Sequence, residues 1–206
     1  MNSHETFVIN KFKEVAKLIP AKSKILDIGC NDGKLRDFLI DCEYYGLDLN
    51  KEIINSMIKN RIKAKQIDLN KDELPFKQER FEYITMLDVL EHIVNPEKLL
   101  MDSKNRLNEN GKMIITLPND YHILNKIRFL LNKPLTENPF APHGHLHYFS
   151  IRDGERFLKK NGFKIIKKIP IPPVKPFVIP QSIKNFLGKN FPQTFARDVL
   201  YLMERN

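Results

Sequence analysis

The chain has 206 residues, which is long enough for one well-buried domain and too short for two of ordinary size. Its composition, 42% hydrophobic and 29% charged, is that of a globular protein, and no apolar run approaches the ~20 residues that span a bilayer. The formal charge of +9 would suit an anionic partner, but the lysines are dispersed along the chain. We therefore do not expect nucleic acid as a partner.

The N-terminal segment lacks an apolar stretch followed by a small-residue cleavage site. Its apolar residues recur at helical spacing, at Phe12, Val15, Ala16 and Ile19. This pattern predicts an amphipathic helix at the start of a cytoplasmic protein. Cys30 and Cys42 are too few for a disulfide framework, so we expect two reduced thiols.

Beyond this helix, short β-rich runs alternate with helical stretches. The predicted strands are KILDIGC, EYYGLDL, AKQIDL, FEYITML and KMIITLP. The predicted helices are DGKLRDFLI, KEIINSMIKN and PEKLLMDSKNRL, the last ending near Leu107 with Asn110-Gly111 as its stop signal. This alternation, with continuously apolar strands, predicts an α/β fold in which helices cover both faces of a parallel sheet.

The pattern loosens between Asn119 and Ser150, where we expect a helix from Tyr121 to Leu131 and an acceptor lid over residues 119–150. A helix in IRDGERFLKKNGF, stopped by Asn161-Gly162, and a strand in FKIIKKI follow. Residues 170–192 carry six prolines and form an insertion that cannot be a central strand. FARDVLYLMER closes the chain as a strand, and with no clear helix before it we expect an antiparallel edge hairpin in a single domain, 1–206.

A glycine loop, Asp27-Ile28-Gly29-Cys30-Asn31-Asp32-Gly33, joins the first strand to the next helix. Gly29 and Gly33 would allow a tight turn and close approach of a ligand to the backbone at the carboxyl end of the sheet. Asp48 ends the next strand 19 residues after Gly29, close to the roughly 20-residue offset at which an acid reaches a ribose. Its carboxylate can accept hydrogen bonds from both ribose hydroxyls.

Dinucleotide-binding proteins share this layout, but their G-x-G-x-x-G loop would need glycine where Asn31 and Lys34 stand. Asp32 would also place a negative charge beside a pyrophosphate. S-adenosylmethionine (SAM) carries an ammonium and a sulfonium but no phosphate, so Asp27 and Asp32 suit its charges. Taken alone, Asp32 has a second interpretation, in which it only caps the following helix.

A longer succession of motifs carries a resemblance to a known family. In chain order, these motifs are ILDIGCNDGKL, YYGLDL, IDLNKDELPF, FEYITMLDVLEHI, GKMIITLPN and HLHYFS…FLKKNGF. In this order of motifs the chain resembles class I SAM-dependent methyltransferases, especially the small-molecule methyltransferase-11/12-like group. The resemblance covers approximately residues 20–170. It implies a Rossmann-like, seven-stranded, mostly parallel sheet of order 3-2-1-4-5-7-6, with strand 7 antiparallel and helices on both faces.

The resemblance also implies how SAM would be bound. Gly29 and the backbone around Cys30 would hold the methionine part, and Asp48 would hold the ribose. Asp68 with Leu69 would contact the adenine, and Leu87 with Asp88 would border the methionine and the reacting methyl group. The expected cofactor-binding residues are Asp27, Gly29, Cys30, Asn31, Gly33, Asp48, Leu49, Asp68, Leu69, Leu87 and Asp88. Asn31 replaces the second glycine usual in the family's loop.

Methyl transfer from a sulfonium is an in-line displacement, so the protein's main tasks are alignment and exclusion of water. An acceptor that begins protonated would benefit from a general base, and His92 and His145 are the candidates. His92 has the alternative role of packing or holding its loop by hydrogen bonds. Tyr121, Phe140 and Tyr148 could form aromatic walls of the acceptor pocket, or they could serve only in packing.

His143, His145 and His147 would share one face of an extended segment. Three alternating histidines without a nearby carboxylate are a weak signal for metal, so no metal ion is expected. His145 or His147 is instead expected to line the acceptor pocket or to orient Tyr148.

We therefore expect a SAM-dependent methyltransferase that modifies oxygen or nitrogen of a small-molecule acceptor and releases S-adenosylhomocysteine. One alternative is a non-catalytic partner protein of the same fold, favoured only by the glycine missing at Asn31. An RNA-directed methyltransferase is disfavoured, because Leu87-Asp88-Val89-Leu90 differs from the Asn/Asp-Pro-Pro-aromatic sequence that grips a flipped base. The apolar and basic insertion at 170–192 leaves membrane-surface contact and a homodimer interface open.

Overall fold

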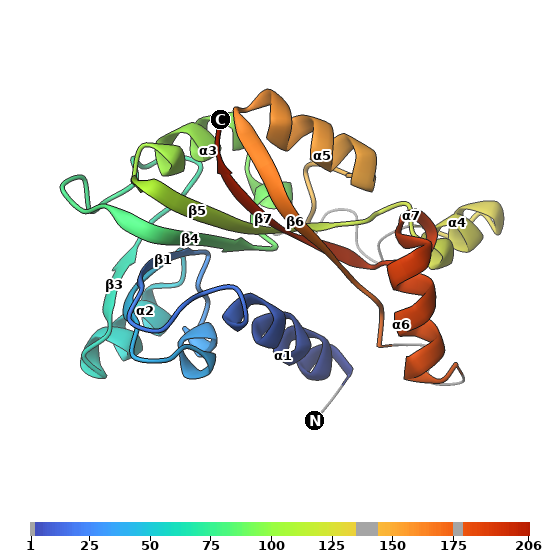
Figure 1. Ribbon diagram of the computed structural model, residues 1–206, viewed down its shortest axis with the longest axis horizontal. Coiled ribbons are helices and arrows are strands. Elements are labelled where there is room, and N and C mark those ends of the chain that lie inside the picture. The colour runs from blue at the N-terminus through green and yellow to red at the C-terminus, as the bar shows by residue number, and fades with distance from the viewer. Residues whose placement is uncertain (1–2, 135–143, 175–178) are drawn as a thin grey trace.

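The computed structural model describes residues 3–134, 144–174 and 179–206. In chain order the strands are β1 (Lys24–Ile28), β2 (Glu43–Asp48), β3 (Lys63–Gln66), β4 (Phe81–Leu87), β5 (Leu107–Pro118), β6 (Phe163–Ile171) and β7 (Asp198–Arg205). They form one sheet in the order β3-β2-β1-β4-β5-β7-β6, in which β7 is antiparallel to both neighbours and the other pairs are parallel (Figure 1). The Rossmann-like sheet and its strand order, predicted above, are confirmed.

Helices cover both faces of this sheet. They are α1 (Ser3–Ala16), α2 (Lys51–Lys59), α3 (Pro96–Lys104), α4 (Ile123–Leu130), α5 (Ile151–Lys160), α6 (Gln181–Asn190) and α7 (Pro192–Phe195), with short 3-10 helices η1 (Lys34–Phe38) and η2 (Leu90–His92). Figure 1 shows α3 and α5 on one face and α1 and α2 on the other. Met113 and Ile114, neighbours on β5, are both fully buried, and each belongs to one of the two larger core clusters on opposite faces of the sheet. This burial on both faces explains why the strand is continuously apolar.

Two predicted helix boundaries are wrong. The stretch DGKLRDFLI forms only the 3-10 helix η1, because Leu39 is already extended and Asp41 adopts a left-handed φ of +52° before β2 begins. The pair Asn110-Gly111 does not end a helix but lies inside β5. A Cβ on Gly111 would lie 2.9 Å from the Phe81 carbonyl oxygen, beside an irregularity in the β4–β5 register. Glycine therefore serves a close approach of two strands at this position.

The C-terminal connection also differs from the prediction. The strands β6 and β7 do form an antiparallel pair, but α6 and α7 lie between them in sequence. Proline obscured α6, because Pro180 stands immediately before this helix and Pro192 stands two residues after it. Pro170 lies in β6, which is an edge strand and tolerates a residue without an amide hydrogen.

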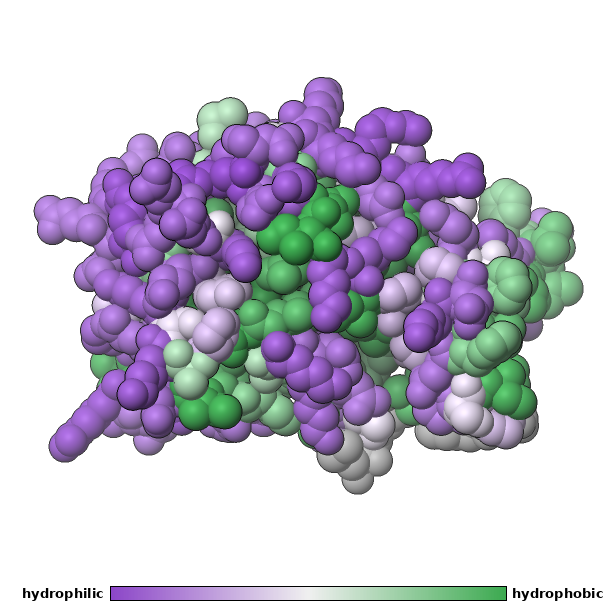
Figure 2. Space-filling view, viewed as in Figure 1, coloured by the Kyte–Doolittle hydropathy of each residue, from purple (hydrophilic) through white to green (hydrophobic). Residues whose placement is uncertain are grey.

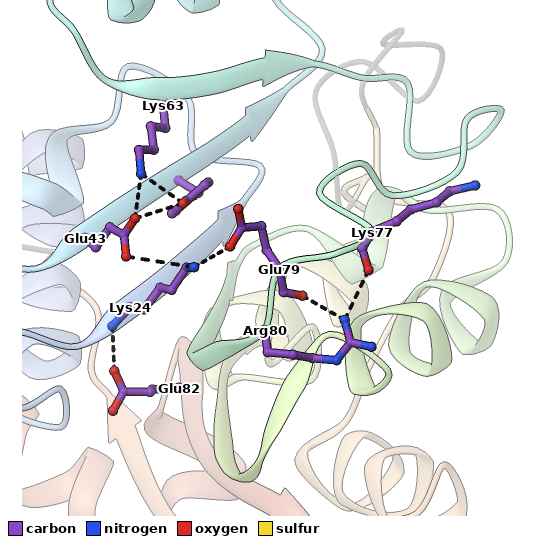
Figure 3. Close-up of polar contacts among 8 residues, drawn as sticks. Lys24, Glu43, Lys63, Lys77, Glu79, Arg80 and Glu82 are labelled. Carbon is purple, nitrogen blue, oxygen red and sulfur yellow. Dashed lines mark hydrogen bonds and ion pairs between the residues drawn. The ribbon is translucent and has the colours of Figure 1, made fainter.

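Charged side chains form a network at the amino ends of β1, β2 and β3, the sheet edge opposite the glycine loop (Figure 3). The Lys24 ammonium contacts Glu79, and the Lys63 ammonium donates to Glu43 at 2.5 Å and to the Tyr45 hydroxyl at 3.0 Å. These groups are partly exposed, so the network contributes little to stability.

Within the described part of the chain, no helix is both long enough and apolar enough to cross a membrane.

Candidate active site

The glycine loop follows β1 and is attached to the end of β2. The amides of Gly29 and Cys30 both donate to the Leu47 carbonyl oxygen, at 2.8 and 2.9 Å. Gly29 has a φ of +73°, and a Cβ there would lie 2.5 Å from Cγ2 of Val89. Asn31 has a φ of +47°, a left-handed conformation that asparagine tolerates better than most residues. Asn31 thus adopts a backbone conformation that glycine readily supplies.

Asp48 lies between this loop and the start of α2. Its Oδ2 accepts from the Asn31 amide at 2.8 Å, and its Oδ1 accepts from the Asn50 amide at 2.9 Å. Because each carboxylate oxygen has two lone pairs, both can accept a further hydrogen bond from a ribose hydroxyl. Leu49, beside it, is exposed.

Asp27 is buried beneath the loop. The Tyr44 hydroxyl donates to it at 2.5 Å and the Thr85 hydroxyl at 2.6 Å. Burial raises the pKa of Asp27 to about 6, although these two hydrogen bonds favour the ionised form. Asp27 therefore joins β1 to its neighbours β2 and β4 directly under the loop.

The remaining expected cofactor residues lie at the same edge of the sheet. Asp68 follows β3, accepts from the Asn70 amide at 3.0 Å and pairs with Lys71, which lowers the pKa of Asp68. Leu69 packs against the main core cluster. Asp32 accepts from the Lys34 amide at 3.2 Å and pairs with its ammonium, but the N-cap of η1 is Gly33 and not Asp32.

A pocket of about 350 Å³ opens at the carboxyl ends of β4 and β5. Its walls come from α1, the β4–η2 turn, the β5–α4 connection, residues 144–148 and the start of β7. Acidic and imidazole groups line it together: Asp88, Glu91, His92, Asp120 and His145. Tyr148 also lines the pocket, as predicted, whereas Tyr121 is exposed and Phe140 lies outside the described residues.

Asp88, which follows β4, has a left-handed φ of +58° and accepts from the Thr116 hydroxyl at 2.6 Å. It also contacts the ammonium of Lys11, which donates to Asp198 at 2.6 Å. Burial opposes the charge on Asp88, but Lys11 outweighs it and lowers the pKa of Asp88. Burial, opposed by Lys11 and reinforced by Asp88, raises the pKa of Asp198 to about 6. The sequence analysis missed Lys11 and Asp198, since their partners are distant in the chain.

The sequence analysis also did not single out Glu91. An acidic residue between the apolar residues Val89, Leu90 and Ile93 is nevertheless a signal that a charged group is buried there. The residue is 1% exposed, and its Oε2 has no hydrogen-bond partner among the described residues. Burial, reinforced by the charge of Asp88, raises the pKa of Glu91 to about 8. A buried polar atom without a partner is costly, so this carboxyl group is a candidate functional residue.

The two candidate bases meet in the pocket. The rings of His92 and His145 lie edge to face, with their centroids 5.0 Å apart. Nδ1 of His145 lies 3.5 Å from Oδ1 of Asp120, which raises the pKa of His145. His147 lies elsewhere, with Nε2 2.8 Å from the Ile93 carbonyl oxygen. Residues 144–148 are not a strand, so the shared face expected for the alternating histidines does not form, and His143 lies outside the described residues.

A family model described as a methyltransferase domain matches residues 2–168. The chain belongs to this methyltransferase family. SAM is accordingly its cofactor, and the loop fits that molecule, because the Asp48 carboxylate at its edge retains lone pairs for hydroxyl groups.

Curated relatives of this methyltransferase are distant. An uncharacterized protein of Methanocaldococcus jannaschii is 28% identical over 81% of the chain and 76% of that protein. The ubiquinone biosynthesis O-methyltransferase of Coxiella burnetii is 26% identical over 53% of the chain and 50% of that enzyme. The match thus spans about half the length of this second relative.

Solved structures share the fold. A SAM-dependent methyltransferase from Mesorhizobium loti aligns with a TM-score of 0.65 at 15% identity, covering 93% of this chain and 96% of that one. A Haloferax volcanii structure, of a complex with the Trm112 methyltransferase activator, aligns with a TM-score of 0.66 at 10% identity, covering 97% and 89%. At these identities the likeness shows the fold alone.

Proposed function

We propose that this protein transfers the methyl group of SAM to an oxygen or nitrogen of a small molecule bound in the pocket beside η2. One observation carries the proposal: the loop and the pocket meet at consecutive residues. Val89 packs on Gly29 of the loop, while its neighbour Asp88 lines the pocket. An acceptor in the pocket would therefore lie next to the methionine end of a cofactor held by the loop.

Bound SAM supplies a methyl group on a positively charged sulfur. The chain's own groups would hold and orient the reactants: the Gly29 backbone at the methionine part, Asp48 at the ribose, and Asp68 with Leu69 at the adenine. A lone pair of the acceptor forms the new bond to the methyl carbon as the carbon–sulfur bond breaks and sulfur keeps its electron pair. His145, oriented by Asp120, is proposed to take the acceptor's proton, with His92 as the second candidate.

The non-catalytic alternative has little support, because Asn31 already adopts a left-handed conformation. The RNA-directed alternative predicts tight binding that weakens with salt, and the dispersed lysines argue against it. A filter-binding titration with RNA at two salt concentrations distinguishes this alternative from a small-molecule enzyme.

Calorimetric titration of the whole chain with SAM and with S-adenosylhomocysteine tests the proposal. We expect micromolar binding and a loss of roughly 100-fold in Asp48→Ala, because two charge-assisted hydrogen bonds contribute about 1.5 kcal/mol each. Asp37→Ala, which removes an exposed acid of η1, is the matched control and should bind normally. Failure of the wild-type chain to bind either compound would favour the non-catalytic alternative.

Contact with a membrane surface stays a prediction. Apolar side chains are exposed on α4 and α6, at the end of the molecule where Figure 2 shows a green edge, and include Ile127, Phe129, Leu130, Ile183 and Phe186. Basic side chains accompany them, Lys126 and Arg128 in α4 and Lys189 in α6, and would favour an anionic surface. For the expected contact of the insertion at 170–192, co-sedimentation with vesicles of anionic lipid should be lost in Ile183→Ser/Phe186→Ser. Absence of co-sedimentation by the wild-type chain would exclude this contact.

A further inference from the structure

Three metal-binding side chains converge in the acceptor pocket from two separate segments. Glu91 and His92 belong to η2, and His145 lies more than fifty residues later. One ligand atom from each of the three lies within 4.8 Å of the other two. A tetrahedral site with bonds of ~2.1 Å separates its ligand atoms by roughly 3.4 Å, so small side-chain rotations would close this set around an ion.

The Glu91 carboxylate is the strongest sign of a missing partner. It is 1% exposed, and its Oε2 has no hydrogen-bond partner in the described part of the chain. Burying a carboxylate oxygen without a partner is costly, and such groups in proteins are paired or coordinate a metal. A cation between Glu91 and the two imidazoles would remove this cost.

Both histidines are arranged as metal ligands usually are. Nδ1 of His92 lies 3.2 Å from the Gly144 carbonyl oxygen, and Nδ1 of His145 lies 3.5 Å from the Asp120 carboxylate. An imidazole that donates through Nδ1 to such an oxygen carries on Nε2 the lone pair that binds a cation. Outer partners of this kind fix the tautomer and orient the ring.

The backbone holds the two segments together independently of any ion. The Glu91 carbonyl oxygen accepts from the Leu146 amide at 2.7 Å and from the His147 amide at 3.2 Å. His147 adds its contact to the Ile93 carbonyl oxygen at 2.8 Å. The position of His145 relative to Glu91 is therefore built into the fold.

From this juxtaposition we infer that Glu91, His92 and His145 bind one divalent transition-metal cation of the Zn²⁺, Mn²⁺ and Co²⁺ class. Two imidazole nitrogens with one carboxylate oxygen suit these ions, whereas Mg²⁺ and Ca²⁺ prefer oxygen ligands throughout. Three protein ligands leave positions for oxygen atoms of the methyl acceptor. The alternating histidines considered in the sequence are not this set, because only His145 belongs to it.

The binding site rests on geometry, and its use in catalysis rests on the proposed function. A hydroxyl group bound to the cation would release its proton to solvent more readily, because the cation stabilises the oxyanion. The ionised oxygen would then attack the methyl carbon. With the cation present, His92 and His145 serve as ligands, and the acceptor would ionise without a histidine base.

Calorimetric titration of the chelator-treated whole chain with Zn²⁺ alone, without SAM, tests the site. We expect one ion per chain and affinity at least roughly tenfold weaker in Glu91→Gln and in His145→Ala. Asp120→Asn should weaken binding by about ten- to 100-fold through the orientation of His145. His122→Asn is the matched control: it removes another imidazole of the pocket, keeps a residue that caps α4, and should leave affinity unchanged.

Thermal melting of each variant shows whether it folds. If Glu91→Gln does not fold, His145→Ala provides the test, because the His145 side chain is partly exposed and its removal is less disruptive to the fold. Absence of one-to-one Zn²⁺ binding, equal binding by both variants, or preference for Mg²⁺ over Zn²⁺ would each overturn the inference. Zn²⁺ binding by a chain that does not bind SAM would instead uphold the site and refute the proposed function.

Discussion

Lys11 of α1 and Asp88 at the end of β4 form an ion pair in which the lysine side chain is 2% exposed. The same ammonium donates to Asp198 at the start of β7, at 2.6 Å. One cation thus pairs with two carboxylates that line the pocket. The N-terminal helix is thereby attached to the two strands that support the proposed chemistry.

Replacing this lysine should destabilise the protein. In Lys11→Met the Asp88 and Asp198 carboxylates lose the ammonium that both contact, and breaking a buried ion pair on one side costs about 3 kcal/mol or more. Urea denaturation should therefore show a lower free energy of unfolding. Adding Asp198→Asn removes one of the two charges, so Lys11→Met/Asp198→Asn should recover part of the loss. A double variant as unstable as the single one would contradict this account.

Gly29→Ala should impair both folding and cofactor binding. The left-handed φ of +73° costs alanine about 1–2 kcal/mol, and the new methyl group would collide with Cγ2 of Val89. Denaturation and calorimetry with SAM measure the two effects. If the collision with Val89 contributes to the loss, the double variant Gly29→Ala/Val89→Ala should be more stable than the summed losses of the two single variants predict. If the two losses simply add, the whole destabilisation by Gly29→Ala comes from its backbone φ.

Asp27 should make stability depend on pH. Its pKa in the folded chain is about 6, above the ordinary 3.8, so the fold favours the neutral carboxyl group. Between pH 4 and pH 6 the unfolded chain releases this proton and the folded chain retains it, so the contribution of Asp27 to the free energy of unfolding falls as pH rises. The rise in pKa corresponds to about 3 kcal/mol at most.

Asp27→Asn removes this titration. The stability of the variant relative to the wild type should therefore increase from pH 4 to pH 6 and stay constant above that range. Urea denaturation across the range measures the difference. A difference independent of pH would show that Asp27 titrates normally in the folded chain.

The network at the opposite edge of the sheet should have a small effect. Lys24→Met removes the ion pair with Glu79 but keeps most of the apolar stem over the Tyr45 ring. We expect a loss below about 1 kcal/mol in urea denaturation and unchanged SAM affinity, because the groups are partly exposed and remote from the loop. A loss of more than about 2 kcal/mol in the free energy of unfolding would mean that this network contributes strongly to stability.

The amino-acid sequence by itself determined the sheet, the glycine loop and Asp48, because strand periodicity, turn residues and motif order are local properties of the chain. It predicted α2, α4 and α5 for the same reason. The sequence did not predict α6, because prolines stand on either side of this helix. It also did not predict that Asn110-Gly111 lies in a strand, because glycine is needed there for the close approach of the Phe81 carbonyl oxygen of another strand.

Only the tertiary structure decided which charged groups meet in the pocket. Lys11 lies 77 residues from Asp88 and 187 residues from Asp198, and His145 reaches Glu91 because backbone hydrogen bonds join their two segments. No local pattern records such pairings. They form because the carboxyl ends of the parallel strands and the amino end of antiparallel β7 meet at one edge of the sheet, where side chains from distant segments share one buried space.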